Sequence, residues 1–278
     1  MQMEELSPED ILSSSLEILY DYQPITLASA GSVYRYAFDH STGPENPQHI
    51  TLLTPNSLPS NWSLHASDIW ASSIYLADHI DQVNIDTLIA AQAPEKVHVL
   101  ELGAGAGLPG ILIAKLYGDA VLVTVSDYPD EQLIKTLSDN VARNGVLRPC
   151  RAIVHAWGSD PSSLLGERVG FDIIIAADTL WNLDLHSLFI TTLRTTLRKS
   201  ATARVHLVAG LHTGRYTIQS FMNIAQKVGF EVETALEKEI VGVRERLWSV
   251  EGSEDDKERR RWIVWIVLRW NVHELSDH

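Results

Sequence analysis

The feature that most constrains this chain is a run of alternating glycines that joins a predicted strand to a predicted helix. Residues 97–102 are apolar enough to predict a buried strand, and Gly103, Gly105 and Gly107 follow it at once. Because glycine has no Cβ, the backbone there can approach a ligand closely, and the helix predicted over 108–117 presents unpaired N–H groups at its start. The segment therefore predicts a ligand site where this strand ends.

An acidic residue ends the next predicted strand. Residues 120–126 are strand-like, and Asp127 follows them, where a carboxylate is placed to accept hydrogen bonds from two ribose hydroxyls. The strand, glycine loop, helix, second strand and acid are together typical of a nucleoside-binding half-fold. Residues 105–110 also fit the dinucleotide pattern G-x-G-x-x-G, so a nicotinamide cofactor stays open on this pattern alone. Glu101, directly before the loop, either orients the loop or favours a ligand with a positive charge.

Strand-like and helix-like segments alternate from residue 97 to residue 228, which predicts an α/β, Rossmann-like fold with a mostly parallel sheet and helices on both faces. The predicted strands are residues 97–102, 120–126, 150–155, 171–177 and 204–210, and the predicted helices are residues 108–117, 130–144, 184–199 and 215–228. Residues 231–240 and 261–270 then follow as strands with no room for a crossover helix between them. We therefore expect seven strands and a C-terminal antiparallel hairpin, with the charged stretch 252–261 as a solvated loop.

The first part of the chain predicts an N-terminal α/β extension. We place it at residues 1–66, ahead of a main domain at residues 67–278. Its expected elements are a helix that begins at residues 7–10 and short strands at residues 33–38 and 50–53. The main domain then begins with an amphipathic helix over residues 67–80.

Composition limits the partners. The chain has 36 acidic and 22 basic residues and a formal net charge of −14, which opposes nucleic-acid phosphates. The charge would attract a basic protein partner, but a solvated acidic surface without a partner is the more ordinary interpretation. The single cysteine, Cys150, excludes an intramolecular disulfide and fits a reducing compartment, so we expect a cytoplasmic protein, with the nucleus as the alternative. The apolar run 262–268 is too short to span a membrane as a helix. His155, His186 and His212 lack metal-ligand spacing, and no metal is expected.

The glycine segment carries a family resemblance. Residues 101–107, E-L-G-A-G-A-G, resemble motif I of class I S-adenosyl-L-methionine-dependent methyltransferases. Residues 100–109, together with S-D-Y-P-D at 126–130, resemble more closely the family-16 lysine methyltransferases, within them the fungal nicotinamide N-methyltransferase-like proteins. That branch includes an enzyme that modifies the N-terminal region of translation elongation factor 1A. The resemblance covers roughly residues 62–270 and is strongest over 97–182. It implies a seven-β-strand methyltransferase domain with S-adenosyl-L-methionine as cofactor.

The resemblance also implies roles for individual residues. Those implied to bind the cofactor are Trp70, Glu101, Gly103, Ala104, Gly105, Gly107, Asp127, Tyr128, Trp157 and Ala177. On the acceptor side, Asp178 would orient the acceptor nitrogen by hydrogen bonding, and Trp181 would form an aromatic wall. Many lysine-specific members carry an acid-x-x-Tyr pattern at this place, whereas this chain has Asp178-Thr-Leu-Trp181, so lysine specificity does not follow from the resemblance.

Structural interpretations stand beside these roles. Asp127 fits a helix cap as well as a ribose ligand, Trp70 and Trp157 fit an apolar core as well as a cofactor pocket, and His212 lines the acceptor mouth only in one interpretation. The leading function is an N-methyltransferase acting on a protein, at a lysine or an N-terminal amine, with a basic translation factor as one candidate substrate. The alternatives are a small-molecule methyltransferase, acting on nicotinamide or a secondary metabolite, and a cofactor-binding scaffold without activity. The sequence predicts no oligomeric state.

Overall fold

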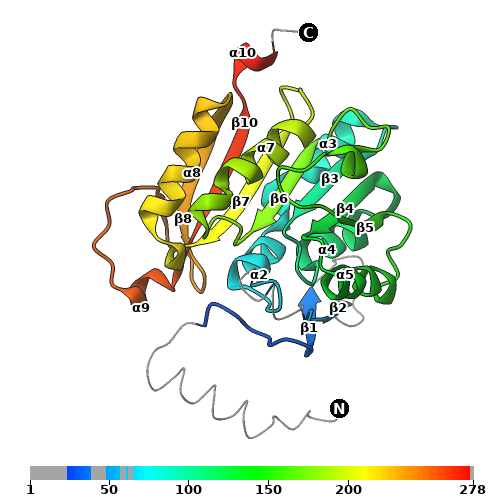
Figure 1. Ribbon diagram of the computed structural model, residues 1–278, viewed down its shortest axis with the longest axis horizontal. Helices are drawn as coiled ribbons and strands as arrows, with labels where there is room; N and C mark the ends of the chain where they lie inside the picture. Colours follow the sequence, from blue (N-terminus) through cyan, green and yellow to red (C-terminus); the bar gives the residue numbers. More distant parts are fainter. Residues whose placement is uncertain (1–23, 39–47, 57–60, 62–64, 276–278) are drawn as a thin grey trace, which may run out of the picture.

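The computed structural model describes residues 24–38, 48–56, 61 and 65–275. The helix expected to begin at residues 7–10 lies outside the described residues. In the described part, one large twisted sheet carries helices on both faces, and a small two-stranded sheet lies at one end of it (Figure 1). This arrangement confirms the α/β, Rossmann-like architecture expected from the alternation of strands and helices.

The large sheet has five parallel strands followed by three in antiparallel pairing. In spatial order it consists of β5 (Cys150–Val154), β4 (Val121–Asp127), β3 (Val97–Leu102), β6 (Ile173–Ala177), β7 (Arg204–Gly210), β10 (Trp262–Trp270), β8 (Phe230–Glu239) and β9 (Glu245–Leu247). β10 lies between β7 and β8 and is antiparallel to both. The last two long strands thus form the antiparallel pair expected at the C-terminal end.

The expectation of seven strands is wrong by one in the described residues. β9 pairs with the edge of β8, and all three of its side chains are exposed. Its sequence therefore has no buried face and no apolar alternation, which are the signals that predict a strand. A hydrogen bond from the Glu239 amide N to the Arg244 carbonyl O, 3.0 Å long, closes the turn that brings β9 back against β8.

Helices cover the two faces of the sheet, and each face has its own hydrophobic cluster. The helices longer than one or two turns are α2 (Ala71–Asp78), α3 (Ile85–Gln92), α4 (Leu108–Tyr117), α5 (Glu131–Arg143), α7 (His186–Thr196) and α8 (Arg215–Lys227). Neighbouring residues of β3 show why there are two clusters: Val99 packs with α2 and α4, whereas Leu100 packs with α7 and α8 on the other face. α2 is shorter than the helix expected over residues 67–80, and α3 was not expected.

The described part of the N-terminal extension shares a core with the main domain. β1 (Val33–Phe38) and β2 (Gln48–Leu53) pair in antiparallel fashion, and Ile50 and Leu52 are fully buried in the same cluster as α4. Asn140 on α5 accepts a hydrogen bond from the Leu53 amide N at 2.8 Å and donates one to the Leu53 carbonyl O at 2.9 Å. The side-chain amide of Asn140 therefore pairs with the backbone N–H and C=O groups at the edge of β2, as a neighbouring strand would.

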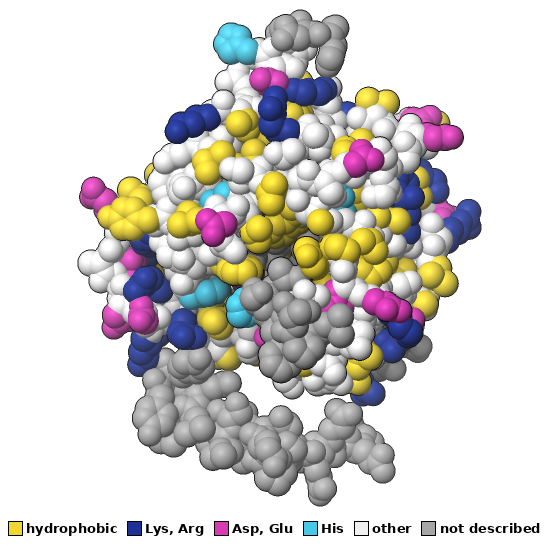
Figure 2. All heavy atoms as spheres, viewed as in Figure 1, with side chains coloured by type: hydrophobic (Ala, Val, Ile, Leu, Met, Phe, Trp, Pro, Cys, Tyr) yellow, Lys and Arg dark blue, Asp and Glu magenta, His cyan; other side chains and the backbone are white. Residues whose placement is uncertain are grey.

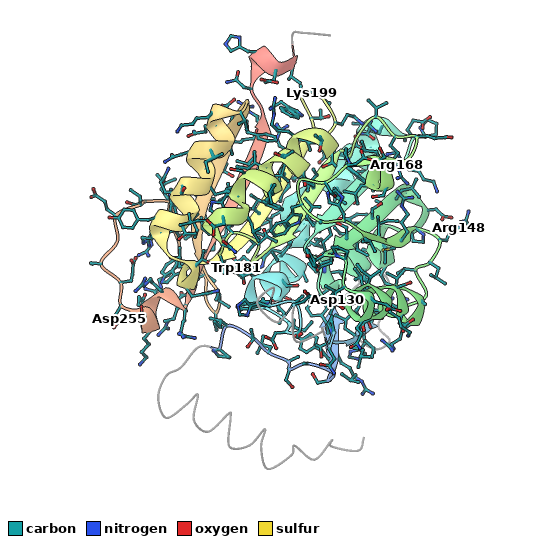
Figure 3. All side chains as sticks on the ribbon, in the orientation of Figure 1. Asp130, Arg148, Arg168, Trp181, Lys199 and Asp255 are labelled. Carbon is teal, nitrogen blue, oxygen red and sulfur yellow. The ribbon has the colours of Figure 1, made fainter. Side chains whose placement is uncertain are left out.

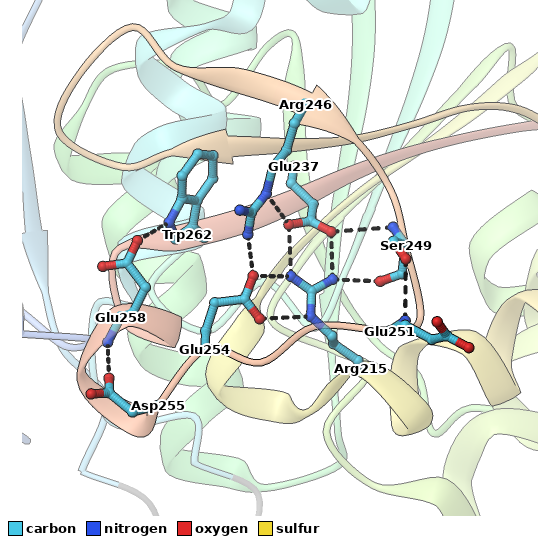
Figure 4. A network of polar contacts seen from close by, with 9 residues as sticks. All are labelled: Arg215, Glu237, Arg246, Ser249, Glu251, Glu254, Asp255, Glu258 and Trp262. Carbon is cyan, nitrogen blue, oxygen red and sulfur yellow. Dashed lines mark hydrogen bonds and ion pairs between the residues drawn. The ribbon is translucent and has the colours of Figure 1, made fainter.

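The charged stretch 252–261 is solvated as expected, since each of its residues is exposed or partly exposed, but it is not wholly a loop. It contains the short helix α9 (Asp256–Arg259), and Figure 4 shows how Glu254 joins an ion network with Arg215 and Glu237. The Nη2 atom of Arg215 lies 2.8 Å from Glu254 and 2.8 Å from Glu237. Because Arg215 is the first residue of α8, this network fixes the start of that helix and the end of the loop after β7.

Candidate active site

The candidate site lies at the carboxyl ends of the parallel strands. β3 has β4 on one side and β6 on the other, so the order of the strands reverses there, and ligands of open α/β sheets bind outside such a point. A cavity of about 260 Å³ occupies this place. Figure 3 labels Trp181 and Asp130 at this end of the strands. In the same orientation, Figure 2 shows hydrophobic side chains gathered near the middle of the surface that faces the viewer.

All twelve residues singled out from the sequence line this one cavity. They are Trp70, Glu101, Gly103, Ala104, Gly105, Gly107, Asp127, Tyr128, Trp157, Ala177, Asp178 and Trp181. They come from α2, from the ends of β3, β4 and β6, and from the loop after β5. The structure thus brings them together, and their individual roles toward a ligand stay predictions.

The glycine loop is shaped by close approach as well as by backbone conformation. Gly103 has a φ of +66°, and a Cβ on it would lie 2.8 Å from the methyl group of Thr179. A Cβ on Gly110 would lie 2.4 Å from Val125 and 2.5 Å from the Glu101 carboxyl. Residues with a side chain therefore do not fit at either position. The loop and α4 pack as closely against β3 and β4 as backbone allows.

Asp127 holds the glycine loop and does not cap α5. Its Oδ2 atom accepts a hydrogen bond from the Gly105 amide N, and its Oδ1 atom accepts one from the Tyr128 amide N, both at 2.7 Å. The cap of α5 is Asp130, which accepts from the amide groups of the first helical turn. The helix-cap interpretation of Asp127 is therefore wrong. Since a carboxylate offers about four lone pairs, Asp127 retains acceptor capacity for a ligand.

The two carboxyl groups on the glycine side are buried without a cation. Burial raises the pKa of Glu101 to about 8, although a hydrogen bond from the Gly110 amide N, 2.9 Å long, favours its charged form. Burial likewise raises the pKa of Asp127 to about 6, against the two amide hydrogen bonds that it accepts. Among the described residues, neither carboxyl forms an ion pair with a lysine or arginine. A cationic ligand in the cavity would therefore stabilise their charged forms.

Asp178 is the strained residue on the other side of the cavity. Its φ is +50°, a left-handed conformation that is uncommon outside glycine. Two hydrogen bonds of 2.8 Å hold it, one from its amide N to the Val208 carbonyl O and one from the Gly210 amide N to its Oδ1 atom. Its Oδ2 atom is buried and has no partner among the described residues. Strain and an unsatisfied buried oxygen together indicate a ligand-binding role.

Aromatic rings enclose this side of the cavity. The Trp181 ring meets the His65 ring edge-on at a centroid distance of 5.2 Å, and the His65 ring meets Trp70 edge-on at 6.0 Å. The Nε1 atom of Trp70 donates a hydrogen bond of 2.9 Å to the His65 carbonyl O. His212 stacks on Trp70 at 5.7 Å but is not among the residues that line the cavity. The interpretation of His212 as a wall of the acceptor mouth gains no support.

Sequence reasoning missed His65 and Asp68, which also line the cavity. No motif marks them, because they precede α2 in a stretch with no regular element, and only the packing of that stretch beside the loop after β6 places them here. Trp157 packs on Phe189 at 4.6 Å in the core and also lines the cavity, so its core interpretation is confirmed and its role toward a cofactor stays a prediction. His186 is a buried core residue whose Nε2 atom lies 2.9 Å from the Leu180 carbonyl O.

Metal-ligand clusters and membrane-spanning helices are both missing from the described part of the chain. No group of three or more histidine, cysteine, aspartate or glutamate side chains in the described part of the chain is placed to hold a metal ion. None of the described helices is long and apolar enough to cross a membrane.

Comparisons with known proteins agree with the site. A family model described as lysine methyltransferase matches residues 60–228. A Schizosaccharomyces pombe protein called protein N-terminal and lysine N-methyltransferase efm7 is 32% identical over 210 residues, which cover 70% of this chain and 79% of that protein. A Neurospora crassa protein of the same name is 26% identical over 250 residues, which cover 82% of this chain and 83% of that protein.

Among solved structures, a SAM-dependent methyltransferase from Aquifex aeolicus is 14% identical, with a TM-score of 0.45, and the likeness covers 66% of this chain and 88% of that chain. The match of the family model is the stronger finding, because it spans more than half of this chain and contains both sides of the cavity. The chain belongs to the lysine methyltransferase family and is an S-adenosyl-L-methionine-dependent methyltransferase.

Proposed function

We propose that this methyltransferase transfers a methyl group from S-adenosyl-L-methionine to a nitrogen of a protein, either a lysine side chain or an N-terminal amine. The observation that carries the proposal is the Asp178 carboxyl, which presents a buried, unpartnered oxygen in a cavity walled by aromatic rings. It lines the same cavity as the glycine loop. Donor and acceptor would thus meet between the ends of β3 and β6.

The glycine side fits this cofactor. Asp127 would accept hydrogen bonds from the ribose hydroxyls, and Gly103 and Gly105 would lie against the amino-acid part. Tyr128 and Trp157 would flank the adenine, since aromatic faces stack on such rings. When bound, the cofactor supplies a methyl group on a positively charged sulfur. The buried Glu101 carboxyl lacks a cation of its own in the described residues, so a positive ligand charge compensates it.

The acceptor side fits an amine. A lysine ammonium has an ordinary pKa of about 10.4, so its nitrogen must lose a proton before it can attack. The Oδ2 atom of Asp178 would accept a hydrogen bond from the nitrogen and aim its lone pair. Trp181 would exclude water around it, and so would Trp70, which we move from the cofactor-binding set to this side because it contacts His65. Alignment of this kind contributes as much as about 7–11 kcal/mol at its upper limit.

A protein is the substrate class that this chain supports best. The relatives in fission yeast and Neurospora crassa are named for protein N-terminal and lysine methylation. The net charge of −14 attracts a basic protein and opposes nucleic acid. Translation elongation factor 1A is the first acceptor to test, because the glycine segment resembles the branch that modifies it. A cytoplasmic location would follow from such a substrate.

The test is transfer of label from tritiated S-adenosyl-L-methionine into a fungal lysate whose own copy of the enzyme is deleted. Purified elongation factor 1A serves as a separate acceptor, and the lysate is divided into protein and small-molecule fractions. Label in a protein band, located by mass spectrometry, supports the proposal. Label confined to the small-molecule fraction overturns the protein substrate and favours nicotinamide or a secondary metabolite.

Calorimetry separates the remaining alternatives. We expect the protein to bind S-adenosyl-L-methionine and not NAD. The reverse result would favour a nicotinamide cofactor, as the G-x-G-x-x-G pattern of residues 105–110 allows. Cofactor binding with no acceptor in either fraction would favour a scaffold without activity. The matched control is Asp178→Asn, which we expect to bind cofactor normally and to transfer little label.

A further inference from the structure

His65 is a titratable side chain of the cavity to which the proposed function gives no role. It lines the same cavity as Asp178 and Trp181, and its ring meets the Trp181 ring at 5.2 Å. Among the described residues, neither ring nitrogen of His65 has a hydrogen-bond partner. The residue is exposed, so its imidazole is open to solvent as well as to the cavity. A free imidazole between a reacting centre and water is placed to carry a proton outward.

The backbone of His65 is held in an uncommon conformation. Its φ is +53°, in the left-handed region. Its carbonyl O accepts the 2.9 Å hydrogen bond from the indole of Trp70, and its ring packs edge-on against the same indole at 6.0 Å. Contacts to two tryptophans from different segments therefore fix the ring. Such strain persists where the surrounding structure imposes it, and it gathers at functional sites.

The other ionisable groups that line the cavity are acidic, phenolic or buried. They are Asp68, Glu101, Asp127, Tyr128, His155 and Asp178. Asp68 lies in the same segment as His65, and burial raises the pKa of the Asp68 carboxyl while a charged His65 would lower it. His155 is 3% exposed and packs beside Thr192, away from solvent. His212 stacks on Trp70 and is not among the residues that line the cavity. His65 is thus the imidazole of the cavity that reaches solvent.

We propose that His65 is the catalytic base that removes the proton from the acceptor ammonium, which rests on the proposed transfer to an amine. His65 takes one proton from the nitrogen, and Asp178 keeps the freed lone pair aimed by its hydrogen bond. The nitrogen then forms its bond to the methyl carbon as the carbon–sulfur bond of the donor breaks, and that electron pair stays on sulfur. The imidazolium finally releases its proton to solvent.

The variant that tests this step is His65→Asn. Asparagine tolerates the left-handed backbone and keeps a polar side chain of similar reach, but it cannot accept the proton. The matched control is His212→Asn, which removes an imidazole that also contacts Trp70 but does not itself line the cavity. Both variants are assayed with tritiated cofactor and the protein acceptor labelled by the parent, between about pH 7 and pH 9.5.

For His65→Asn we expect kcat to fall about 100-fold at neutral pH, within the range for removal of a general base, with the cofactor Kd unchanged. The deficit should shrink as pH rises, because a growing fraction of the acceptor amine is then neutral without help. His212→Asn should stay within about threefold of the parent. Equal activity of His65→Asn and the parent, or a loss that is the same at every pH, overturns the proposal.

A small-molecule acceptor separates this proposal from the proposed substrate. A parent enzyme that labels no protein but labels a small amine, with that transfer reduced about 100-fold in His65→Asn, would contradict the protein substrate and support His65 as the base. Equal labelling of the small amine by the parent and by His65→Asn would overturn the role of His65.

Discussion

The two sides of the cavity are built in different ways. The donor side is mostly backbone from two segments that are close in the sequence, the glycine loop after β3 and the turn after β4, and Asp127 ties them together. The acceptor side is mostly side chains from segments far apart in the sequence: His65 and Trp70 before and at α2, and Asp178 and Trp181 after β6. The difference teaches that main-chain geometry shapes the donor side of the cavity, whereas side-chain packing shapes the acceptor side.

The two sides also differ in which residues adopt positive φ angles and in how their carboxyl groups are hydrogen-bonded. On the donor side, positive φ angles fall on glycine, where they cost little, and the buried carboxyls each accept amide hydrogen bonds. On the acceptor side, His65 and Asp178 adopt positive φ without being glycine, and Asp178 keeps one oxygen unsatisfied. We therefore expect donor-side changes to act on binding or stability and acceptor-side changes to act on turnover.

The largest effect should come from Asp178→Asn. The amide keeps an oxygen for the Gly210 amide N and tolerates the left-handed backbone, but it loses the charge that holds the acceptor nitrogen. We expect kcat to fall by about 10²- to 10³-fold with the cofactor Kd within twofold of the parent. Steady-state kinetics and calorimetry check this. A comparable loss of cofactor affinity would contradict the expectation that acceptor-side residues act on turnover and donor-side residues on binding.

Asp127→Ala should act on binding instead. It removes the acceptor for the amide groups of Gly105 and Tyr128 as well as the two oxygens offered to the ribose. Because hydrogen bonds to a charged group contribute about 1.5–3 kcal/mol, we expect the cofactor Kd to rise by about 100-fold. Calorimetry measures it. Unchanged affinity would mean that the cofactor lies elsewhere in the cavity.

Gly110→Ala should loosen the donor side without adding or removing a polar group. The new Cβ would lie 2.4 Å from Val125 and 2.5 Å from the Glu101 carboxyl, so α4 must shift away from β4. Overpacking of this kind lowers the free energy of unfolding by about 1–3 kcal/mol. Urea unfolding gives the value. Gly145→Ala is the contrasting variant, since a Cβ there meets no atom and only its φ of +69° opposes the change.

The buried carboxyls predict how stability depends on pH. Because the pKa of Glu101 is raised from 4.5 to about 8 in the folded protein, the folded state binds more protons than the unfolded state between those values. The free energy of unfolding therefore falls as pH rises from about 6.5 to 8, by at most about 1.4 kcal/mol per pH unit. Buried histidines change the free energy of unfolding mainly below this pH range, because burial lowers their pKa values, for His206 to about 4. They therefore do not mask the effect of Glu101.

The control for that pH dependence is Glu101→Gln, in which the fall over this window should disappear. Added S-adenosyl-L-methionine should stabilise the parent more at pH 8 than at pH 6.5, because its positive charge favours the ionised Glu101. Unfolding curves at the two pH values, with and without cofactor, make the comparison. A parent whose stability is flat over the window would contradict the assignment of a raised pKa to Glu101.

The smallest effect should come from Trp181→Tyr, which restores the hydroxyl of the acid-x-x-Tyr pattern. Trp181 makes an edge contact with the His65 ring, and a tyrosine ring can make a contact of the same kind. We expect a change within about threefold in KM for the acceptor and none in cofactor affinity. Kinetics with the identified acceptor test it. A gain of more than tenfold on lysine peptides would show that this position sets the choice of amine.

Much of the sheet could be predicted from the sequence. The five parallel strands and the four long helices that follow them are confirmed within a few residues, because each has a buried apolar run or an amphipathic period. β9 and α9 were not predicted, since β9 is wholly exposed and the charges around α9 resemble a solvated loop. Ion pairs join both segments to their neighbours: Arg246 of β9 pairs with Glu237 of β8, and Glu254, just before α9, pairs with Arg215 of α8.

The sequence by itself determined the donor side of this protein: three alternate glycines after a buried strand and an acid after the next one. Their spacing is local, so the strand–loop–helix geometry follows from it directly. Only the tertiary structure decided the acceptor side, because His65, Trp70, Asp178 and Trp181 meet through the order of the strands and the packing of α2 beside β6 and β7. Contacts between separate elements depend on the whole sheet, and no local pattern encodes them.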